Sequence, residues 1–225
     1  MKKILSRALG ALVPLALLVL APGCGSNDII DPIYEIPSER SLVVVPFKAE
    51  GFEKGYDSPL GIELADRVTK NLQGKAEFKV KPQDELLALF DQQGDARQLG
   101  AREIAEKTGA DYVLLGDVRS WQLRDPGSVN LLRGTSAVTL ILFESPRAAA
   151  EKGDKGAGAK KGRIVRTTEV TALYPNEYGL DGVGVGDFGG DGVRVIETGL
   201  KTRTAKAIAE LLYPHTKEEQ RLAAD

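Results

Sequence analysis

The feature that most constrains this chain is a run of apolar, strand-forming residues from Tyr112 to Leu115, which continues through Gly116 to Val118. So few polar interruptions indicate a strand that is buried on both faces, at the centre of a sheet covered by helices. Gly109, just before the run, suits the C-terminal end of a helix, because glycine readily takes a left-handed backbone conformation there. We therefore place this strand at the centre of the predicted domain.

The chain before this strand alternates between strand and helix patterns. One helix has the clearest signal: Ser58 and Pro59 suit its first positions, and apolar residues then recur every four residues as far as Leu72. Strand–helix–strand order favours neighbouring parallel strands. The expected elements are a strand over 41–47, the helix over 58–73, a strand over 77–80, and helices over 82–93 and 96–108.

The chain after this strand changes to alternating apolar and polar residues, which is typical of antiparallel hairpins. Strands are expected over 116–122, 129–144 and 163–174, followed by a closing helix over 193–213. Two segments lack apolar periodicity: 146–162 is expected as a flexible hairpin insert and 175–192 as a Gly-rich loop. The sequence therefore predicts an α/β fold, a single domain over 40–215 with a mixed sheet of about five strands covered by helices, and then a charged tail over 216–225.

The first 23 residues have the pattern of an export signal peptide. Lys2, Lys3 and Arg7 form a positive start, an apolar run covers 8–21, and small residues follow it. The run is too short to span a hydrocarbon core of roughly 30 Å. The pattern predicts that residues 1–23 are removed and that the mature chain is exported.

Cys24 is the only cysteine, so no internal disulfide can form. The segment Leu20-Ala21-Pro22-Gly23-Cys24 resembles a bacterial lipoprotein signal, in which the cysteine is acylated and becomes the first residue. Its Ala and Pro depart from the usual pattern, and an ordinary cut nearby that leaves a free thiol is the alternative. By the same resemblance Gly25 favours the outer membrane. Residues 24–39 are expected to form a polar tether between anchor and domain.

Four segments of the predicted domain resemble one family. They are the strand Leu42-Val43-Val44-Val45-Pro46-Phe47, the helix from Leu60 to Leu72, the strand and turn from Phe78 to Leu86, and the strand from Thr108 to Gly116. This set is similar to the TolB amino-terminal domain and to the related lipoproteins CsgG, of curli export, and LpoB, an activator of a peptidoglycan synthase. The resemblance covers residues 40–145 and 193–213. It implies a non-catalytic envelope protein that docks onto other envelope proteins or oligomerises.

No arrangement of residues points to catalysis, a metal or a cofactor. Gly184-Val185-Gly186-Asp187-Phe188-Gly189 has the spacing of a dinucleotide-binding loop, but it lies near the C-terminus after a loop instead of joining a strand to a helix. His215 is the only histidine, and a single histidine without cysteine ligands cannot build a zinc site. We expect His215 at an exposed helix end. Acidic pairs such as Glu63 and Asp66 are expected on solvent-facing surfaces. A formal charge of −2 gives no reason to expect a nucleic acid partner.

Two surfaces are candidates for contacts with a partner. Trp121, Leu123, Leu131 and Leu132 form a partner surface if their strands extend beyond the sheet, with core packing as the alternative. The Lys and Arg residues over 152–166 either keep a loop soluble or contact an anionic partner.

The leading hypothesis is a lipid-anchored binding or assembly module of envelope or secretion machinery, facing the periplasm and contacting another envelope protein. One alternative is a subunit of an oligomeric outer-membrane export channel, by the resemblance to CsgG. The other is a periplasmic protein that binds a small ligand.

Overall fold

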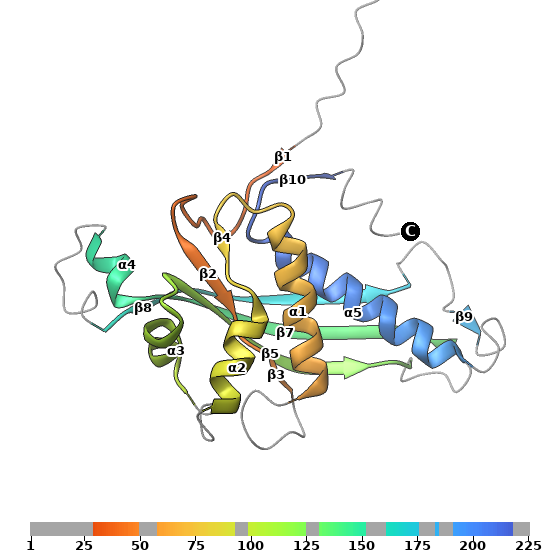
Figure 1. Cartoon of the computed structure of the whole chain (residues 1–225). Coiled ribbons are helices and arrows are strands. Elements are labelled where there is room, and N and C mark those ends of the chain that lie inside the picture. Colours follow the sequence, from red (N-terminus) through yellow and green to blue (C-terminus); the bar gives the residue numbers. More distant parts are fainter. Residues whose placement is uncertain are drawn as a thin grey trace, which may run out of the picture.

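The structure is a computed structural model that describes residues 29–49, 58–92, 99–124, 131–151, 161–175, 183–184 and 191–217. A mixed six-stranded sheet and the five helices of these residues confirm the predicted α/β fold (Figure 1). β2 runs parallel to its neighbours β4 and β5, and β5, β7 and β8 run antiparallel. The strands lie in the order β4 (Lys79–Val80), β2 (Ser41–Val44), β5 (Tyr112–Gln122), β7 (Gly134–Glu144) and β8 (Arg163–Tyr174), and β3 (Lys48–Ala49) also pairs with β5.

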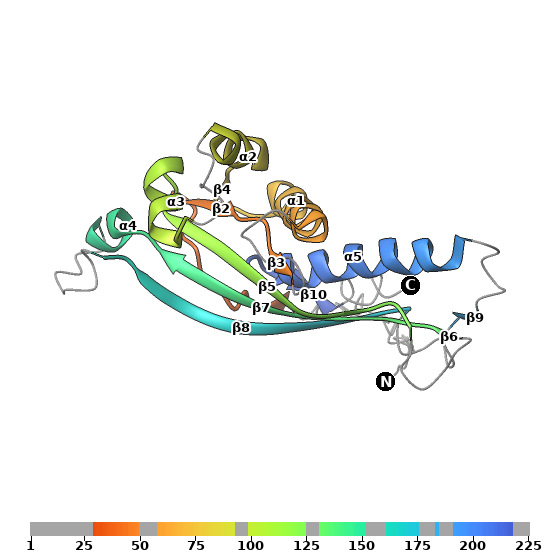
Figure 2. The ribbon, with the colours of Figure 1, turned by 90° about the horizontal axis from the view of Figure 1, so that it is seen from below.

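The described helices cover both faces of this sheet around β2, but only one face of β7 and β8 (Figure 2). α1 (Pro59–Gln73) and α5 (Gly192–Glu210) lie side by side over one core, which contains Leu42 and Val44 of β2. α5 follows the direction of β7 and β8 (Figure 2). α2 (Gln83–Gln92) and α3 (Ala101–Thr108) pack on the second core, which contains Val43 and Val45. Because alternate residues of a strand point to opposite faces, β2 is buried on both sides.

The local signals in the sequence explain where α1 and β5 begin. Ser58 caps α1, since its Oγ accepts a hydrogen bond from the Gly61 amide at 3.3 Å. Gly109 ends α3 with a φ of 62°, a left-handed conformation that suits glycine. β5 follows and lies between β2 and β7, so the strand predicted to be central is confirmed in that place.

Two glycines allow the chain to close around the buried Phe47. A Cβ on Gly116 would lie 2.4 Å from Phe47 Cδ1, and a Cβ on Gly61 would lie 1.8 Å from Phe47 O. The Phe47 amide also donates a hydrogen bond to Gly61 O at 3.1 Å. α1 and β5 therefore approach Phe47 as closely as they do because both positions lack a side chain.

The N-terminal segment 29–39 does not form a free tether, as the sequence suggested, but lies against the domain. β1 (Ile29–Ile30) pairs with β10 (His215–Thr216) next to the end of α5. Tyr34 is only 1% exposed, and its N–H donates to Leu211 O at 2.9 Å. The reason is the apolar content of this otherwise polar segment: the burial of Tyr34 acts together with the pairing of β1 with β10 and the hydrogen bond to Leu211.

The expected insert 146–162 begins with a helix rather than a flexible loop. α4 (Pro146–Glu151) buries Ala148 and Ala149, and the Ala148 amide donates to Ser145 Oγ at 3.2 Å. Alanine has the highest helix propensity, and a serine cap satisfies one of the free amides of the first turn. Residues 152–160, on which the rest of that prediction falls, lie outside the described residues.

Two further expectations change. His215 is buried instead of exposed, because it belongs to β10 and is paired there with Ile30. The third helix starts at Ala101, and residues 93–98 lie outside the described residues.

A short ladder of β6 (Leu131–Leu132) and β9 (Val183–Gly184) lies apart from the main sheet. None of the described helices has both the length and the apolar character needed to cross a bilayer.

Candidate functional site

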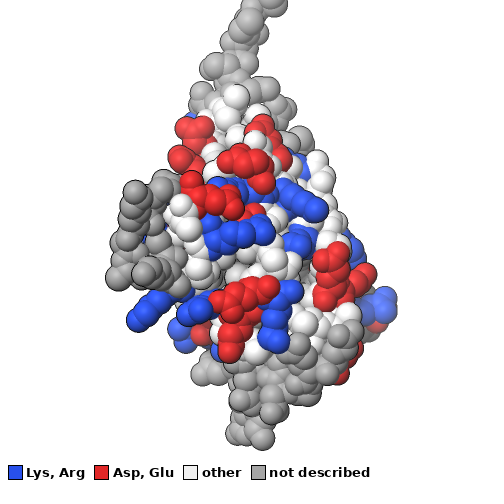
Figure 3. Space-filling model, turned by 60° about the vertical axis from the view of Figure 1, so that its left-hand side comes forward, with Lys and Arg blue, Asp and Glu red and all other residues white. Residues whose placement is uncertain are grey.

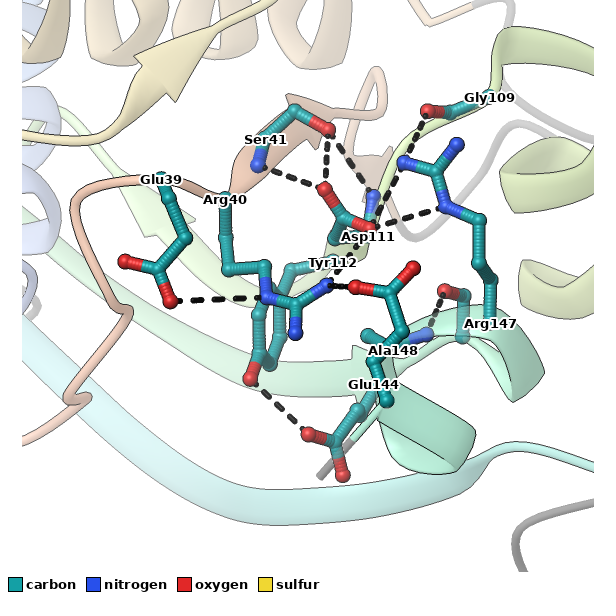
Figure 4. A network of polar contacts seen from close by, with 11 residues as sticks. Glu39, Arg40, Ser41, Gly109, Asp111, Tyr112, Glu144, Arg147 and Ala148 are labelled. Atoms are coloured by element: carbon teal, nitrogen blue, oxygen red, sulfur yellow. Dashed lines mark hydrogen bonds and ion pairs between the residues drawn. The ribbon is translucent and has the colours of Figure 1, made fainter. Parts of the chain in front are cut away.

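A buried polar network lies where β2 and β5 begin, beside α4 (Figure 4). At its centre is the carboxylate of Asp111, a residue that is 3% exposed. Asp111 Oδ2 accepts hydrogen bonds from the Ser41 amide at 3.0 Å and from Ser41 Oγ at 2.8 Å. Ser41 Oγ in turn accepts a hydrogen bond from the Asp111 amide at 3.1 Å. Side chains as well as backbone therefore join the starts of these two strands.

Two arginines complete this Asp111 network. Arg147 of α4 donates to Asp111 Oδ1 from Nη2 at 2.8 Å and from Nε at 3.2 Å. Arg40 lies with its Nη1 3.7 Å from the same oxygen, and it also donates to Glu151 at the end of α4. Both ends of α4 are thus held against the start of β2 and β5, so the network fixes the base of the insert.

The charge of Asp111 is stabilised by its partners. Burial raises the pKa of a carboxyl group, but the hydrogen bonds from Arg147 and Ser41 outweigh this effect and hold the pKa of Asp111 below its ordinary value of 3.8. Asp111 is therefore ionised at neutral pH, and the ion pair with Arg147 is complete.

A second buried carboxylate fixes the two strands that flank the insert. Glu144, the last residue of β7, is fully buried. Its Oε1 accepts a hydrogen bond from the Tyr112 hydroxyl at 2.9 Å, and its Oε2 accepts one from Nε of Arg163 at 2.7 Å. Arg163 is the first residue of β8, so this pair holds together the points where the chain leaves the sheet and returns to it.

These contacts make the Asp111 network a clamp rather than a reactive centre. Ser41 Oγ donates its proton to a carboxylate that Arg147 already neutralises, so that carboxylate is poorly placed to act as a base toward the serine. Over the described ranges, no three His, Cys, Asp or Glu side chains come together to hold a metal ion. The arrangement suits the positioning of the insert and of the N-terminal segment.

A second ionic cluster joins α1 to α5. Lys201 Nζ lies 2.6 Å from Glu63 Oε2 and 2.7 Å from Glu197 Oε1, and Arg67 binds the other oxygen of Glu63 at 2.9 Å. Burial raises the pKa of Glu63, but hydrogen bonds from Lys201 and Arg67 outweigh it, and the pKa lies below the ordinary 4.5. Asp66 pairs with Lys70. The acidic residues of α1 are therefore neutralised structural groups.

A groove of about 480 Å³ lies between α1 and α2. Gln83 is only 5% exposed there, and neither its amide nitrogen nor its amide oxygen has a hydrogen-bond partner among the residues that the structure describes. The side chains of Glu63 and Asp66 in this groove are already paired with cations. The lining consists of Pro59, Ile62, Glu63, Asp66, Gln83, Asp84 and Leu87.

The residues predicted as a partner surface are placed differently from one another. Leu132 is fully buried, and Trp121 is half-buried against the core beneath α1 and α5. Leu123 is half-buried, and the side chain of Leu131 lies outside the described residues. Cys24 and all but Gly184 of the glycine-rich motif also lie outside them. A partner contact through Trp121 and Leu123 stays a prediction.

The sequence reasoning missed the buried carboxylates Asp111 and Glu144, and the arginines Arg40 and Arg147 that contact Asp111. Asp111 and Glu144 each lie beside an apolar run that was correctly assigned to a buried strand. A charge in such a place is rarely left without a partner, and this signal could have identified both. Arg40 and Arg147, which both contact Asp111, carry no such signal.

Charges of both signs are interleaved on the side of the molecule that carries α4 (Figure 3). Within the described residues, this side presents no extended surface of a single sign of charge. Two residues of α4 contribute to the mixture: Arg147 and Glu151 have side chains that are 60% and 54% exposed.

No family model matches the chain, and no curated protein sequence matches it. Solved structures of similar fold include the lipoprotein GNA1162 from Neisseria meningitidis, at 15% identity and a TM-score of 0.43, over 60% of this chain and 82% of that chain. A PelC dodecamer from Paraburkholderia phytofirmans aligns at 15% identity and a TM-score of 0.44, over 82% and 96%. The LpoB C-terminal domain from Salmonella enterica aligns at 18% identity and a TM-score of 0.36, over 61% and 84%. These likenesses concern the fold alone.

Proposed function

We propose that this chain is a bacterial envelope lipoprotein, acylated on Cys24, whose domain acts without catalysis as a binding or assembly module of envelope or secretion machinery. The observation that carries the proposal is the position of Cys24. The single cysteine of the chain stands directly after a segment with the sequence pattern of an export signal, and the first described strand begins only a few residues later.

The docked N-terminal segment supports this arrangement. Residues 25–28 are the only ones between Cys24 and the first strand, Ile29–Ile30. A segment this short holds the domain next to the lipid, where it meets other proteins of the same membrane. The acyl chains would supply the anchoring energy, since two such chains already give stable membrane attachment.

The non-catalytic role is supported by the chemistry of the buried polar groups. The carboxylates of Asp111 and Glu144 are engaged by serine, tyrosine and arginine side chains. These partners neutralise the charges and fix the geometry of the sheet around the insert. A domain built in this way offers shaped surfaces for binding.

Acylation is tested by growing cells with a clickable fatty acid and comparing the chain with Cys24→Ser, with Ser26→Ala as the matched control. We expect the parent chain and Ser26→Ala to carry the label and to sediment with the outer membrane. Cys24→Ser should lose the label and leave the membrane fraction. Equal labelling of parent and Cys24→Ser would refute the proposal.

The assembly role is tested by crosslinking in intact cells, followed by purification of the acylated chain from solubilised membranes. We expect one or a few envelope proteins to be recovered with the parent and lost when crosslinking is omitted. A large homogeneous particle of this chain alone, by sizing in detergent, would favour the alternative of an oligomeric export channel. A clean monomer without any partner would contradict both.

A further inference from the structure

The exposed apolar side chains of this domain are concentrated near its N-terminal segment. Five large apolar residues stand out as exposed among the described residues. Four of them lie on that segment and at the start of β8: Ile29 at 67%, Ile33 at 41%, Ile164 at 60% and Val165 at 48%. The fifth, Val193, lies at the start of α5. Clustered exposed apolar side chains are a recurrent feature of surfaces that bind a partner or a membrane.

A direct contact brings the two groups together. The Arg166 guanidinium donates a hydrogen bond to Ile33 O at 3.4 Å, and Arg166 directly follows Ile164 and Val165 in β8. One step further along both segments, burial raises the pKa of Tyr34, and Thr168 and Arg166 lie near enough to its hydroxyl to oppose that effect. Ile33 and Arg166 are thus in contact, and Ile164 and Val165 directly precede Arg166 on this edge strand; we group these four residues as the β8 edge patch.

The patch lies at one end of the sheet order. β8 pairs with β7 on one side, and no other strand of the described residues pairs with its outer side. β4, followed in the chain by α2, forms the opposite edge. A flat object placed against the β8 edge would therefore leave α2 on the far side of the domain.

Positive charge accompanies the β8 part of this patch, whereas the exposed Asp31 and Glu35 flank Ile33. Lys161, Arg163 and Arg166 are all exposed, although Arg163 is also paired with Glu144. Apolar side chains mixed with lysine and arginine are the composition of surfaces that settle at the headgroup level of an anionic bilayer. A purely apolar contact with another protein would give no reason for these lysine and arginine side chains.

The short stretch of chain between Cys24 and the domain indicates that the surface covering the patch is a membrane. Five Cα–Cα steps separate Cys24 from Ile29, so the two residues are at most roughly 18 Å apart at about 3.5 Å per residue. From Ile29 onward the segment is fixed by β10 and by the buried Tyr34. Acyl chains on Cys24 would thus hold this side of the domain at the lipid surface.

We infer that the β8 edge patch rests on the anionic leaflet that holds the acyl chains, so that α2 and the β4 edge point away from the bilayer. This inference rests on the proposed acylation of Cys24. It adds an orientation: the membrane covers the patch, and the partners of the protein reach the opposite side.

The test places a fluorescent label at chosen points of the acylated full chain. Acylation blocks the Cys24 thiol, so Ile33→Cys or Ile164→Cys supplies the sole free thiol for an environment-sensitive dye. Ala88→Cys, at an exposed position of α2, is the matched control. Each protein is reconstituted into vesicles of phosphatidylethanolamine and phosphatidylglycerol, and quenching by headgroup spin-labelled lipid is measured.

We expect quenching at positions 33 and 164 to exceed that at position 88 several-fold. Replacing Ile164→Thr and Val165→Thr, which keeps β-branched residues in the strand, should lower quenching at position 33 at least twofold. Val193→Thr should not change it. The inference is overturned if position 164 stays as unquenched as position 88, as it would if a protein covered the patch. It is also overturned if the two threonines have no effect, because the tether alone would then explain the proximity.

The two proposals fail in different ways. A second free thiol and a mass without acyl chains would show that Cys24 is unmodified, which refutes the proposed function together with the orientation. An acylated chain that gives equal quenching at positions 88 and 164 refutes the orientation alone.

Discussion

Arg147 contacts Asp111 through two nitrogens, Nη2 at 2.8 Å and Nε at 3.2 Å from the same carboxylate oxygen, and so joins α4 to the start of the central strand. Because the Asp111 carboxylate is buried and also accepts two hydrogen bonds from Ser41, its removal leaves several donors without an acceptor. The two partners differ in burial, because the side chain of Arg147 is 60% exposed and that of Asp111 only 5%.

Asp111→Ala should therefore lower the free energy of unfolding by about 3 kcal/mol, as when one partner of a buried pair is removed. Arg147→Ala should cost about 1 kcal/mol, since water can replace it at Asp111. Urea unfolding followed by circular dichroism measures both. Asp66→Ala, which breaks an exposed pair with Lys70, is the control and should change stability by less than about 0.5 kcal/mol. A cost for Asp111→Ala no greater than that control would contradict the clamp.

The same carboxylate should make stability depend on acid. The pKa of Asp111 is lower in the folded protein than its ordinary 3.8, so the unfolded chain takes up the proton first as pH falls. Its contribution is complete above the unfolded pKa and is lost as pH falls through the folded pKa. The stability difference between the parent and Asp111→Asn should therefore be constant from pH 7 to about 5 and shrink below about 4. Urea unfolding at these pH values measures it, and a difference that stays constant down to pH 3 would count against the ionised network.

The elements predicted correctly are those whose signals lie within a few residues. Ser58 caps α1 from three residues away, and Gly109 ends α3 within its own turn, so the sequence itself contains both partners of each contact. The Asp111 network depends instead on Ser41, 70 residues earlier, and on Arg147, 36 residues later. Pairing over such separations is decided by the whole fold, and no local pattern encodes it.

The N-terminal segment shows a second limit of local reasoning. Residues 29–36 have no helical or alternating pattern, and their burial depends on β10 and α5, which come near the end of the chain. The signal that was available is composition: a tether with a tyrosine and several isoleucines contains more apolar surface than solvent favours.

Tyr34→Ala should detach this segment from the domain. Truncating a buried aromatic side chain costs about 3–5 kcal/mol. Hydrogen exchange gives the more specific reading, because the Tyr34 amide that donates to Leu211 should lose protection while the Phe47 amide keeps it. Ile29→Thr, at a side chain that is 67% exposed, should change neither quantity. Full protection of residue 34 in Tyr34→Ala would show that the segment is held by other contacts.

Gly116→Ala should strain the contact with Phe47. The added Cβ would meet the ring at 2.4 Å, and overpacking of this kind costs about 1–3 kcal/mol. Phe47→Leu is smaller at that point, so the double variant should be more stable than the sum of the two single effects predicts. Thermal or urea unfolding of the four proteins gives the coupling. Gly74→Ala, where a Cβ would meet nothing within 4 Å, is the control. Strictly additive effects would mean that the ring does not oppose the new methyl group.

Gln83 should be a site where a less polar residue stabilises the fold. Its amide is buried beside the groove between α1 and α2 without a partner among the described residues, which costs desolvation energy with no hydrogen bond in return. Gln83→Met keeps the length of the side chain and should raise the free energy of unfolding by about 1 kcal/mol. Gln73→Met, at an exposed position of α1, should change it by less than about 0.5 kcal/mol. Destabilisation by Gln83→Met would mean that the amide does have a partner, and urea unfolding of the two variants side by side distinguishes these outcomes.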